Sequence, residues 1–229
     1  MAGRPAIIAH RGASSEATEN TLLAIRRALE IGADGIEVDV RLSADKQPIL
    51  MHDERVDRTT DGHGFVSEMT LAELKRLNTP EGEEIPTLDE ALELVDGRCL
   101  LVVELKVPEA VEPSLRVVER HNALSWVVFS SFYHRALLRL LKLNPDVRTG
   151  VIVASQPVSP AKLALDAKAS IIFQKHTYLD ERVVEEAHGQ GLDVYTWTVD
   201  DVETALRLAS LGVDGIVTNR PRLLLGAFV

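Results

Sequence analysis

The chain of 229 residues is 45% hydrophobic and 26% charged, a balance typical of a globular protein that buries a substantial core. Its formal net charge of −10 argues against a general nucleic-acid-binding protein, because affinity for a phosphate backbone requires a basic surface. The single cysteine, Cys99, excludes an intrachain disulfide and a cysteine-rich metal site.

The sequence does not indicate a membrane association. The apolar stretch at residues 6–9 is too short for a secretory signal, and it leads directly into His10-Arg11-Gly12. No apolar run approaches the roughly 18 residues of a membrane span. We therefore expect a cytoplasmic protein without stable membrane anchoring, and the sequence predicts no particular oligomeric state.

Short apolar runs, typical of buried strands, alternate with amphipathic helical patterns along the chain. In chain order, the expected strands are Ala6–Ala9, Gly35–Leu42, Leu100–Lys106, Val127–Ser131, Val147–Val153, Ser170–Gln174, Val194–Val199 and Asp214–Thr218. The expected helices between them are Thr21–Ile31, Thr87–Val95, Glu112–His121, His134–Leu143, Pro160–Asp166, Asp180–Gln190 and Asp201–Leu211.

Near-continuous hydrophobic strands that alternate with helices indicate an α/β protein with a parallel sheet covered on both faces. This number of strands favours a (β/α)8 TIM barrel over an open doubly wound sheet. Residues 53–86 interrupt the alternation with a turn-rich stretch and a short helix over Thr70–Leu77, so we expect a small insertion lying over one barrel end. Residues 1–229 carry no low-complexity tract or linker, and we expect a single domain.

One pair of apolar runs is expected to form a hairpin. Only Ser43–Gln47 separates Gly35–Leu42 from Pro48–His52, whereas a parallel crossover needs about a dozen residues or more. Glu37 and Asp39 are two residues apart on the first strand and point to the same face. The hairpin therefore brings the segment around His52 opposite two carboxylates.

In a barrel of this kind, catalytic groups lie at the carboxyl ends of strands and in the loops that follow. The candidates at the other strand ends are His10 and Arg11 with Glu19 just beyond, Glu104 and Lys106, Gln174, and Trp197.

Three of these candidates are carboxylates that should meet at one barrel mouth: Glu37, Asp39 and Glu104. Packed carboxylates repel one another unless a cation compensates. A hard divalent ion, Mg²⁺ or Ca²⁺, suits oxygen ligands, whereas zinc prefers Cys or His. The alternative is a set of structural salt bridges to the nearby cations Arg11, Arg41 and Lys106.

The remaining candidates suit chemistry on a phosphorylated small molecule. His10 and His52 are free to act as base and acid on opposite sides of a scissile bond if carboxylates hold the metal. Arg11 and Lys106 suit a phosphoryl group, although local salt bridging would also explain them. Trp197 could line a small-molecule pocket at the barrel mouth or belong to the ordinary core.

Short motifs occur in a fixed order along nearly the whole chain. They are His10-Arg11-Gly12, Glu19-Asn20-Thr21, Glu37-Val38-Asp39-Val40, His52-Asp53, Arg58-Thr59-Thr60, Ile85-Pro86-Thr87-Leu88, Glu104-Leu105-Lys106, Ser130-Ser131-Phe132, Trp197-Thr198-Val199 and Asp214-Gly215-Ile216. In this order they resemble the glycerophosphodiester phosphodiesterase family. One tripeptide alone would be weak evidence, but the ordered set is highly specific.

The resemblance implies a barrel with a small insertion after the second strand. It implies metal ligands at Glu37, Asp39 and Glu104, an acid–base pair at His10 and His52, phosphate contacts at Arg11 and Lys106, and a further acidic site residue at Glu19. Two positions depart from the family pattern: Asp200, where the family often has Asn, and Asn219, where it often has Asp. We expect both departures to affect rim contacts rather than the core set.

The activity implied is metal-dependent hydrolysis of a glycerophosphodiester to glycerol 3-phosphate and an alcohol. The attacking oxygen would be the substrate's own hydroxyl, through a cyclic phosphate, or water, and the sequence does not decide which histidine is the base. One alternative is a lysophospholipase D-type lipid phosphodiesterase, for which Phe65, Val66, Met69 and Leu71 would form an apolar patch. Others are a non-catalytic ligand-binding barrel and a metal-dependent isomerase or aldolase.

Overall fold

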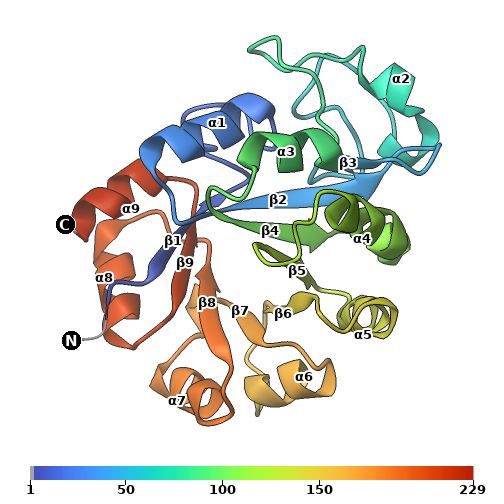
Figure 1. Cartoon of the computed structure of the whole chain (residues 1–229). Helices are drawn as coiled ribbons and strands as arrows, with labels where there is room; N and C mark the ends of the chain where they lie inside the picture. The colour runs from blue at the N-terminus through green and yellow to red at the C-terminus, as the bar shows by residue number, and fades with distance from the viewer. Residues whose placement is uncertain (1–2, 229) are drawn as a thin grey trace.

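The computed structural model describes residues 3–228 and places the strands at the centre of a ring of helices (Figure 1). The parallel strands are β1 (Ala6–His10), β2 (Gly35–Leu42), β4 (Leu100–Leu105), β5 (Val127–Ser131), β6 (Arg148–Val153), β7 (Ile171–Lys175), β8 (Asp193–Trp197) and β9 (Gly215–Thr218). The helices of the ring are α1 (Leu22–Ile31), α3 (Leu88–Val95), α4 (Val111–Arg120), α5 (His134–Leu143), α6 (Pro160–Asp166), α7 (Glu181–Gly189), α8 (Val202–Ser210) and α9 (Pro221–Ala227).

The sheet closes on itself through strand β1. Ala9 pairs with Thr218 of β9 on one side and with Ile36 of β2 on the other, both in parallel register. The predicted (β/α)8 TIM barrel is therefore confirmed. Helix α9 was not expected; it begins at Pro221 and packs against β1 and α8.

The barrel interior is a packed core rather than a channel. Its buried residues are Ile8, Val102, Val128, Ile152, Ile171, Phe173, Tyr195 and Val217. Glycines on neighbouring strands leave room for the two aromatic rings, since a Cβ on Gly150 would lie 2.4 Å from the Phe173 ring. Burying a large apolar side chain is worth about 1.5–3 kcal/mol, so this layer holds the barrel floor beneath the site rigidly.

The predicted hairpin is present as β2 and the short antiparallel strand β3 (Pro48–Leu50), in which Arg41 pairs with Ile49. The Met51 amide then donates to the Asp39 carbonyl at 3.0 Å, which brings the segment after β3 alongside the carboxylates as expected. His52 itself lies beyond the strand end, where its carbonyl accepts from the Nε of Arg41 at 2.8 Å.

The insertion after β3 carries two short helices, η1 (Val66–Glu68) and α2 (Leu71–Leu74), and extends away from the helix ring beside β3 (Figure 1). The predicted helix over Thr70–Leu77 is shorter than expected. Thr70 caps the start of this helix, as predicted. The amides of Arg76 and Leu77 then donate to carbonyls three residues back rather than four, so the α-helix ends early.

The apolar patch that a lipid-cleaving enzyme would need is not formed within residues 3–228. Val66 is 1% exposed and belongs to a small cluster inside the insertion, and Met69 and Leu71 pack against that cluster. Phe65 alone of the four is exposed, at 40%. Two further short helices, η2 (Pro108–Ala110) and η3 (His176–Tyr178), lie in loops after β4 and β7, and no helix of the described residues is long and apolar enough to cross a bilayer.

Candidate active site

Two neighbouring strands bring the predicted carboxylates together at the carboxyl end of the barrel, and a third places a histidine beside them. Strand β2 carries Glu37 and Asp39, and its register places Glu37 beside His10 of β1 and Asp39 beside Glu104 of β4. One oxygen from each carboxylate lies within 4.8 Å of the others. All three side chains are buried or nearly so, which makes the cluster a concentration of negative charge in a site of low dielectric.

Two cations lie against the three carboxylates. The Nε of Arg11 is 3.0 Å from Asp39 Oδ2, and the Nζ of Lys106 is 2.6 Å from Glu104 Oε1 and 3.3 Å from Asp39 Oδ1. Burial disfavours charge on Lys106, but Asp39 and Glu104 outweigh it and raise its pKa. The salt-bridge alternative is thus present for two of its three cations; the third, Arg41, points instead to the His52 carbonyl.

The cluster is left with more negative charge than the two cations neutralise. Burial, then Asp39, raises the pKa of Glu104 to about 7, and burial with Asp39 and Glu104 raises that of Glu37 well above its ordinary value. Burial also acts on Asp39, but Lys106 and Arg11 lower its pKa. The buried Glu37 Oε1 has no hydrogen-bond partner within residues 3–228. Such an oxygen set fits a hard divalent cation.

Local backbone geometry holds the cluster in shape. Asn20, itself 3% exposed, donates from Nδ2 to Asp39 Oδ2 at 2.9 Å and accepts the Asp39 amide at 3.0 Å. Arg11 adopts a positive φ of 57°, which few non-glycine residues adopt, and its amide donates to Glu37 Oε2 at 3.0 Å. Gly12 follows at φ 80°, where an added Cβ would lie 2.6 Å from the Ala24 backbone.

His10 lies between the carboxylate cluster and the loop after β9. Its Nδ1 is 2.7 Å from Asn219 Oδ1, and its Nε2 is 3.9 Å from Glu37 Oε2. The Asn219 amide nitrogen donates to Asp200 at 2.7 Å, so its oxygen must face the imidazole, and His10 Nδ1 is the donor. Burial, then the charge on Arg11, lowers the pKa of His10.

The contact between Asn219 and His10 corrects one expectation. We expected Asp200 and Asn219 to affect only the rim, but the two form a chain that ends on a predicted catalytic histidine. Asp200 also accepts hydrogen bonds from the backbone N–H of Asn219 at 2.8 Å and from the Thr218 hydroxyl at 3.0 Å. These two bonds fix the position of the Asp200 carboxylate. The sequence gives no signal for this contact, because Asn219 lies 209 residues from His10.

His52 has a carboxylate partner. Its Nδ1 is 2.6 Å from Asp53 Oδ1, and Asp53 in turn accepts from the Nε of Arg58 at 2.6 Å. The hydrogen bond from Arg58 contributes most to lowering the pKa of Asp53 well below its usual range. Arg58 also binds Glu19 at 2.9 Å, and Glu19 accepts from Arg11 at 2.8 Å. Glu19 thus links Arg58 of the insertion to Arg11, which lies against the carboxylates. Glu19 itself is not one of the three clustered carboxylates.

These groups surround a pocket of about 120 Å³. Its polar wall includes His10, Arg11, Glu37, His52, Glu104, Lys106 and Ser130, and its apolar wall includes Val102, Phe132, Ile152, Phe173, Trp197 and Val217. Trp197 is held by a hydrogen bond from Nε1 to the Phe173 carbonyl at 2.9 Å and meets Phe132 edge-on at 5.8 Å. A small polar head with an apolar edge would fit between these walls.

Gln174 does not reach the pocket. Because Phe173 faces the barrel interior, its neighbour Gln174 faces the helices, where its side chain is fully buried and donates to the Ser155 carbonyl at 2.9 Å. Its inclusion among the candidates at strand ends was therefore wrong.

A TIM barrel with clustered carboxylates, two cations and a histidine pair at its mouth belongs to the class of barrel enzymes that cleave phosphate esters. Residues 10–223 match the model of the glycerophosphoryl diester phosphodiesterase family, and the chain belongs to this family. A glycerophosphodiester phosphodiesterase of Caldanaerobacter subterraneus subsp. tengcongensis is 38% identical over 232 residues, which cover 96% of each chain.

Solved structures agree with the assignment. A phosphodiesterase of Oleispira antarctica, in complex with the product sn-glycerol-3-phosphate, matches with a TM-score of 0.91 at 32% identity, over 98% of this chain and 96% of that chain. A glycerophosphodiester phosphodiesterase of Agrobacterium tumefaciens matches with a TM-score of 0.87 at 31% identity, over 98% of this chain and 100% of that chain.

Proposed function

We propose that the chain hydrolyses a glycerophosphodiester and releases glycerol 3-phosphate and an alcohol. The observation that supports this most directly is the arrangement of two histidines, two cations and two of the three clustered carboxylates around one pocket, with Asp39 buried behind them. The product bound by the Oleispira antarctica relative supports glycerol 3-phosphate as the product here.

Glu37, Asp39 and Glu104 would hold a divalent metal, Mg²⁺ or Ca²⁺. The unpartnered Glu37 Oε1 and the raised pKa values of Glu37 and Glu104 support this, because a dication would relieve the repulsion within the cluster. When bound, such an ion supplies Lewis acidity that polarises a phosphoryl oxygen and lowers the pKa of an attacking oxygen.

The cations bind the phosphoryl group of the substrate in this proposal. Arg11 and Lys106 both line the pocket and present N–H groups beside the carboxylates, and they would stabilise the negative charge that develops as the phosphorus is attacked. Glu19 keeps the Arg11 guanidinium in place from the far side. Trp197 would pack against the apolar edge of the glycerol.

We assign His10 as the general base and His52 as the general acid. His10 donates from Nδ1 to a neutral amide, so its Nε2 is free to accept the proton of the attacking hydroxyl. His52 donates from Nδ1 to Asp53, a carboxylate that would orient the ring so that the other ring nitrogen can give a proton to the leaving oxygen. As the new P–O bond forms, the bond to the alcohol breaks and His52 protonates the leaving oxygen. Attack by water gives glycerol 3-phosphate directly. Attack by the substrate's own hydroxyl gives a cyclic phosphate, which water then opens to glycerol 3-phosphate as His52 takes the proton of the water and His10 returns its proton to the glycerol oxygen.

Activated substrates separate the two roles. His10→Ala and His52→Ala should each lower hydrolysis of a natural diester by about 10²-fold or more, with folding unchanged. A diester with a nitrophenolate leaving group needs no acid, so it should recover most of its rate with His52→Ala and little with His10→Ala. Full activity of either variant on natural diesters would contradict the assignment. So would a recovered rate on the nitrophenolate diester with His10→Ala rather than His52→Ala.

We also propose that residues 1–229 act as one domain, with residues 53–86 an integral part of it. Support comes from Arg58 of the insertion, which binds Asp53 and reaches Glu19 in the loop after β1. The insertion thereby shares in holding both His52 and Arg11, and its removal should abolish activity.

A further inference from the structure

A second recess begins where the catalytic pocket ends at His52. A hollow of about 430 Å³ lies beyond it and is lined by Arg41, His52, Asp53, Glu54, Arg55 and Phe65. It shares Arg41, Glu54 and Phe65 with a cavity of about 420 Å³ that continues along the insertion. We call these two connected hollows the outer groove.

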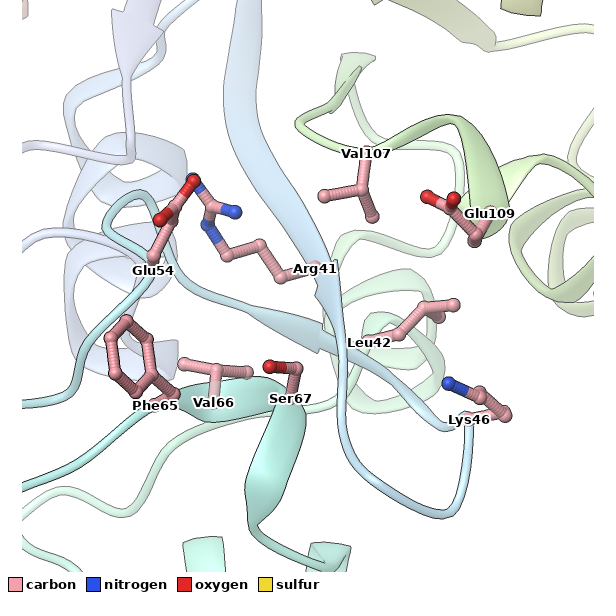
Figure 2. Close-up of a pocket in the computed structure, with 9 residues that line it drawn as sticks. All are labelled: Arg41, Leu42, Lys46, Glu54, Phe65, Val66, Ser67, Val107 and Glu109. Atoms are coloured by element: carbon pink, nitrogen blue, oxygen red, sulfur yellow. The ribbon is translucent and has the colours of Figure 1, made fainter.

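The outer groove lies between the insertion and the loop after β4. Figure 2 shows Arg41 extending from strand β2 toward Glu54, with Phe65 and Ser67 of the insertion on one side and Val107 and Glu109 on the other. Lys46, in the turn of the hairpin, closes its far end. Of its two hollows, the one that His52 also lines adjoins the catalytic histidine.

The position of His52 indicates which part of the substrate lies in this groove. Under the proposed function, on which this inference rests, His52 protonates the leaving oxygen, so the alcohol must lie on the His52 side of the phosphorus. The catalytic pocket, at about 120 Å³, is small and its walls are taken by the phosphate-binding and glycerol-facing groups. The outer groove is the space that His52 adjoins on its other side.

Four of the six Lys, Arg, Asp and Glu side chains that line the outer groove have no ion-pair partner among the described residues. Arg55 and Asp53 are paired with Asp57 and Arg58. By contrast, no residue in the described part of the chain forms an ion pair with any of the other four charged groups, which are Arg41, Lys46, Glu54 and Glu109. The groove thus offers two cations and two carboxylates with no net charge.

This balance of charge selects a particular chemistry. The hydroxyls of a polyol both donate and accept hydrogen bonds, so they can pair with carboxylates and cations together. Choline carries a fixed positive charge and no donor near it, so it would be attracted by Glu54 and Glu109 but repelled by Arg41 and Lys46. A volume near 420 Å³ also accommodates a ring-sized alcohol.

We propose that the outer groove is the binding site for the leaving alcohol and that it selects glycerophosphodiesters of polyols, such as glycerophosphoinositol, over those of choline. Glu54 and Lys46 are the specificity-determining residues at its two ends.

The test compares kcat/KM for glycerophosphoinositol and glycerophosphocholine in the intact protein. The wild type should prefer the inositol diester by about tenfold or more. The single variant Lys46→Gln removes a cation that repels choline and should lower this preference severalfold. The double variant Glu54→Gln/Glu109→Gln removes the carboxylates that attract choline and should raise it. Matched changes on exposed helical residues remote from the groove, Glu185→Gln on α7 and Lys142→Gln on α5, should leave the preference unchanged.

Each outcome separates the two proposals. The outer groove is overturned as the selecting site if the wild type has equal kcat/KM values for the two diesters or prefers the choline diester. It is also overturned if the variants retain the wild-type preference. Hydrolysis would remain established in each of these cases. No turnover of these two diesters or of any other glycerophosphodiester, in the presence of Mg²⁺ or Ca²⁺, would instead overturn the proposed function on which the groove depends.

Discussion

Replacing Glu104 by glutamine should stabilise the protein in excess chelator while it abolishes turnover. Burial and the nearby Asp39 raise the pKa of Glu104 from 4.5 to about 7. Because the folded pKa is the higher one, the folded state holds the proton more tightly, and stability falls as the pH rises from about 4.5 to 7. At about 1.4 kcal/mol for each pKa unit, the loss above pH 7 is about 3 kcal/mol.

Glutamine removes the charge and most of this penalty. It also weakens the contact with Lys106, whose Nζ lies 2.6 Å from Oε1, so we expect a net gain of about 2 kcal/mol. For a chain of this size that corresponds to a rise in Tm of about 4–8 °C at about pH 8. At about pH 5 the wild-type Glu104 is protonated and resembles glutamine, so the difference should nearly vanish.

Thermal unfolding with excess chelator measures this directly across the two pH values. Glu185→Gln, on the exposed face of α7, is the matched control and should shift the Tm at neither pH. A lower Tm for Glu104→Gln at the higher pH, or a gain that does not depend on pH, would refute the repulsion argued for the cluster.

Three further predictions concern positioning and backbone. Asp53→Asn should lower kcat by up to about 10²-fold without unfolding the protein, because His52 loses its carboxylate partner; an unchanged pH–rate profile would contradict this. Asn219→Ala should lower kcat about tenfold or more through loss of the His10 hydrogen bond, with KM little changed. Steady-state kinetics that show an unchanged kcat would mean that the contact is only structural. Gly12→Ala should destabilise the fold by about 1–3 kcal/mol in chemical unfolding, since the Cβ meets the Ala24 backbone at φ 80°; wild-type stability would exclude this strain.

The barrel was predictable because of how its strands are buried. Parallel strands covered on both faces become continuous apolar runs, and β5 lies over the predicted residues Val127–Ser131. The hairpin was predictable from the short link Ser43–Gln47. Helix α9 was missed, and helix α2 is shorter than predicted because the chain after it forms hydrogen bonds three residues back rather than four.

The strand residues of the site could be located from the alternation of side chains, but the contacts between its loops could not. Glu37, Asp39 and Glu104 follow from the alternation of side chains along β2 and β4. The same alternation explains the error at Gln174, which lies one residue beyond the inward-facing Phe173. The contacts of His10 with Asn219 and of Glu19 with Arg58 join distant loops, and no local pattern encodes them.

Release of glycerol 3-phosphate from a panel of glycerophosphodiesters, measured with and without chelator, tests the central proposal most directly. We predict that the wild type forms glycerol 3-phosphate, that excess chelator stops its formation, and that added Mg²⁺ or Ca²⁺ restores it. Turnover that continues unchanged in excess chelator would contradict the role given to the cluster of Glu37, Asp39 and Glu104. No release of glycerol 3-phosphate from any diester would contradict the proposed reaction itself.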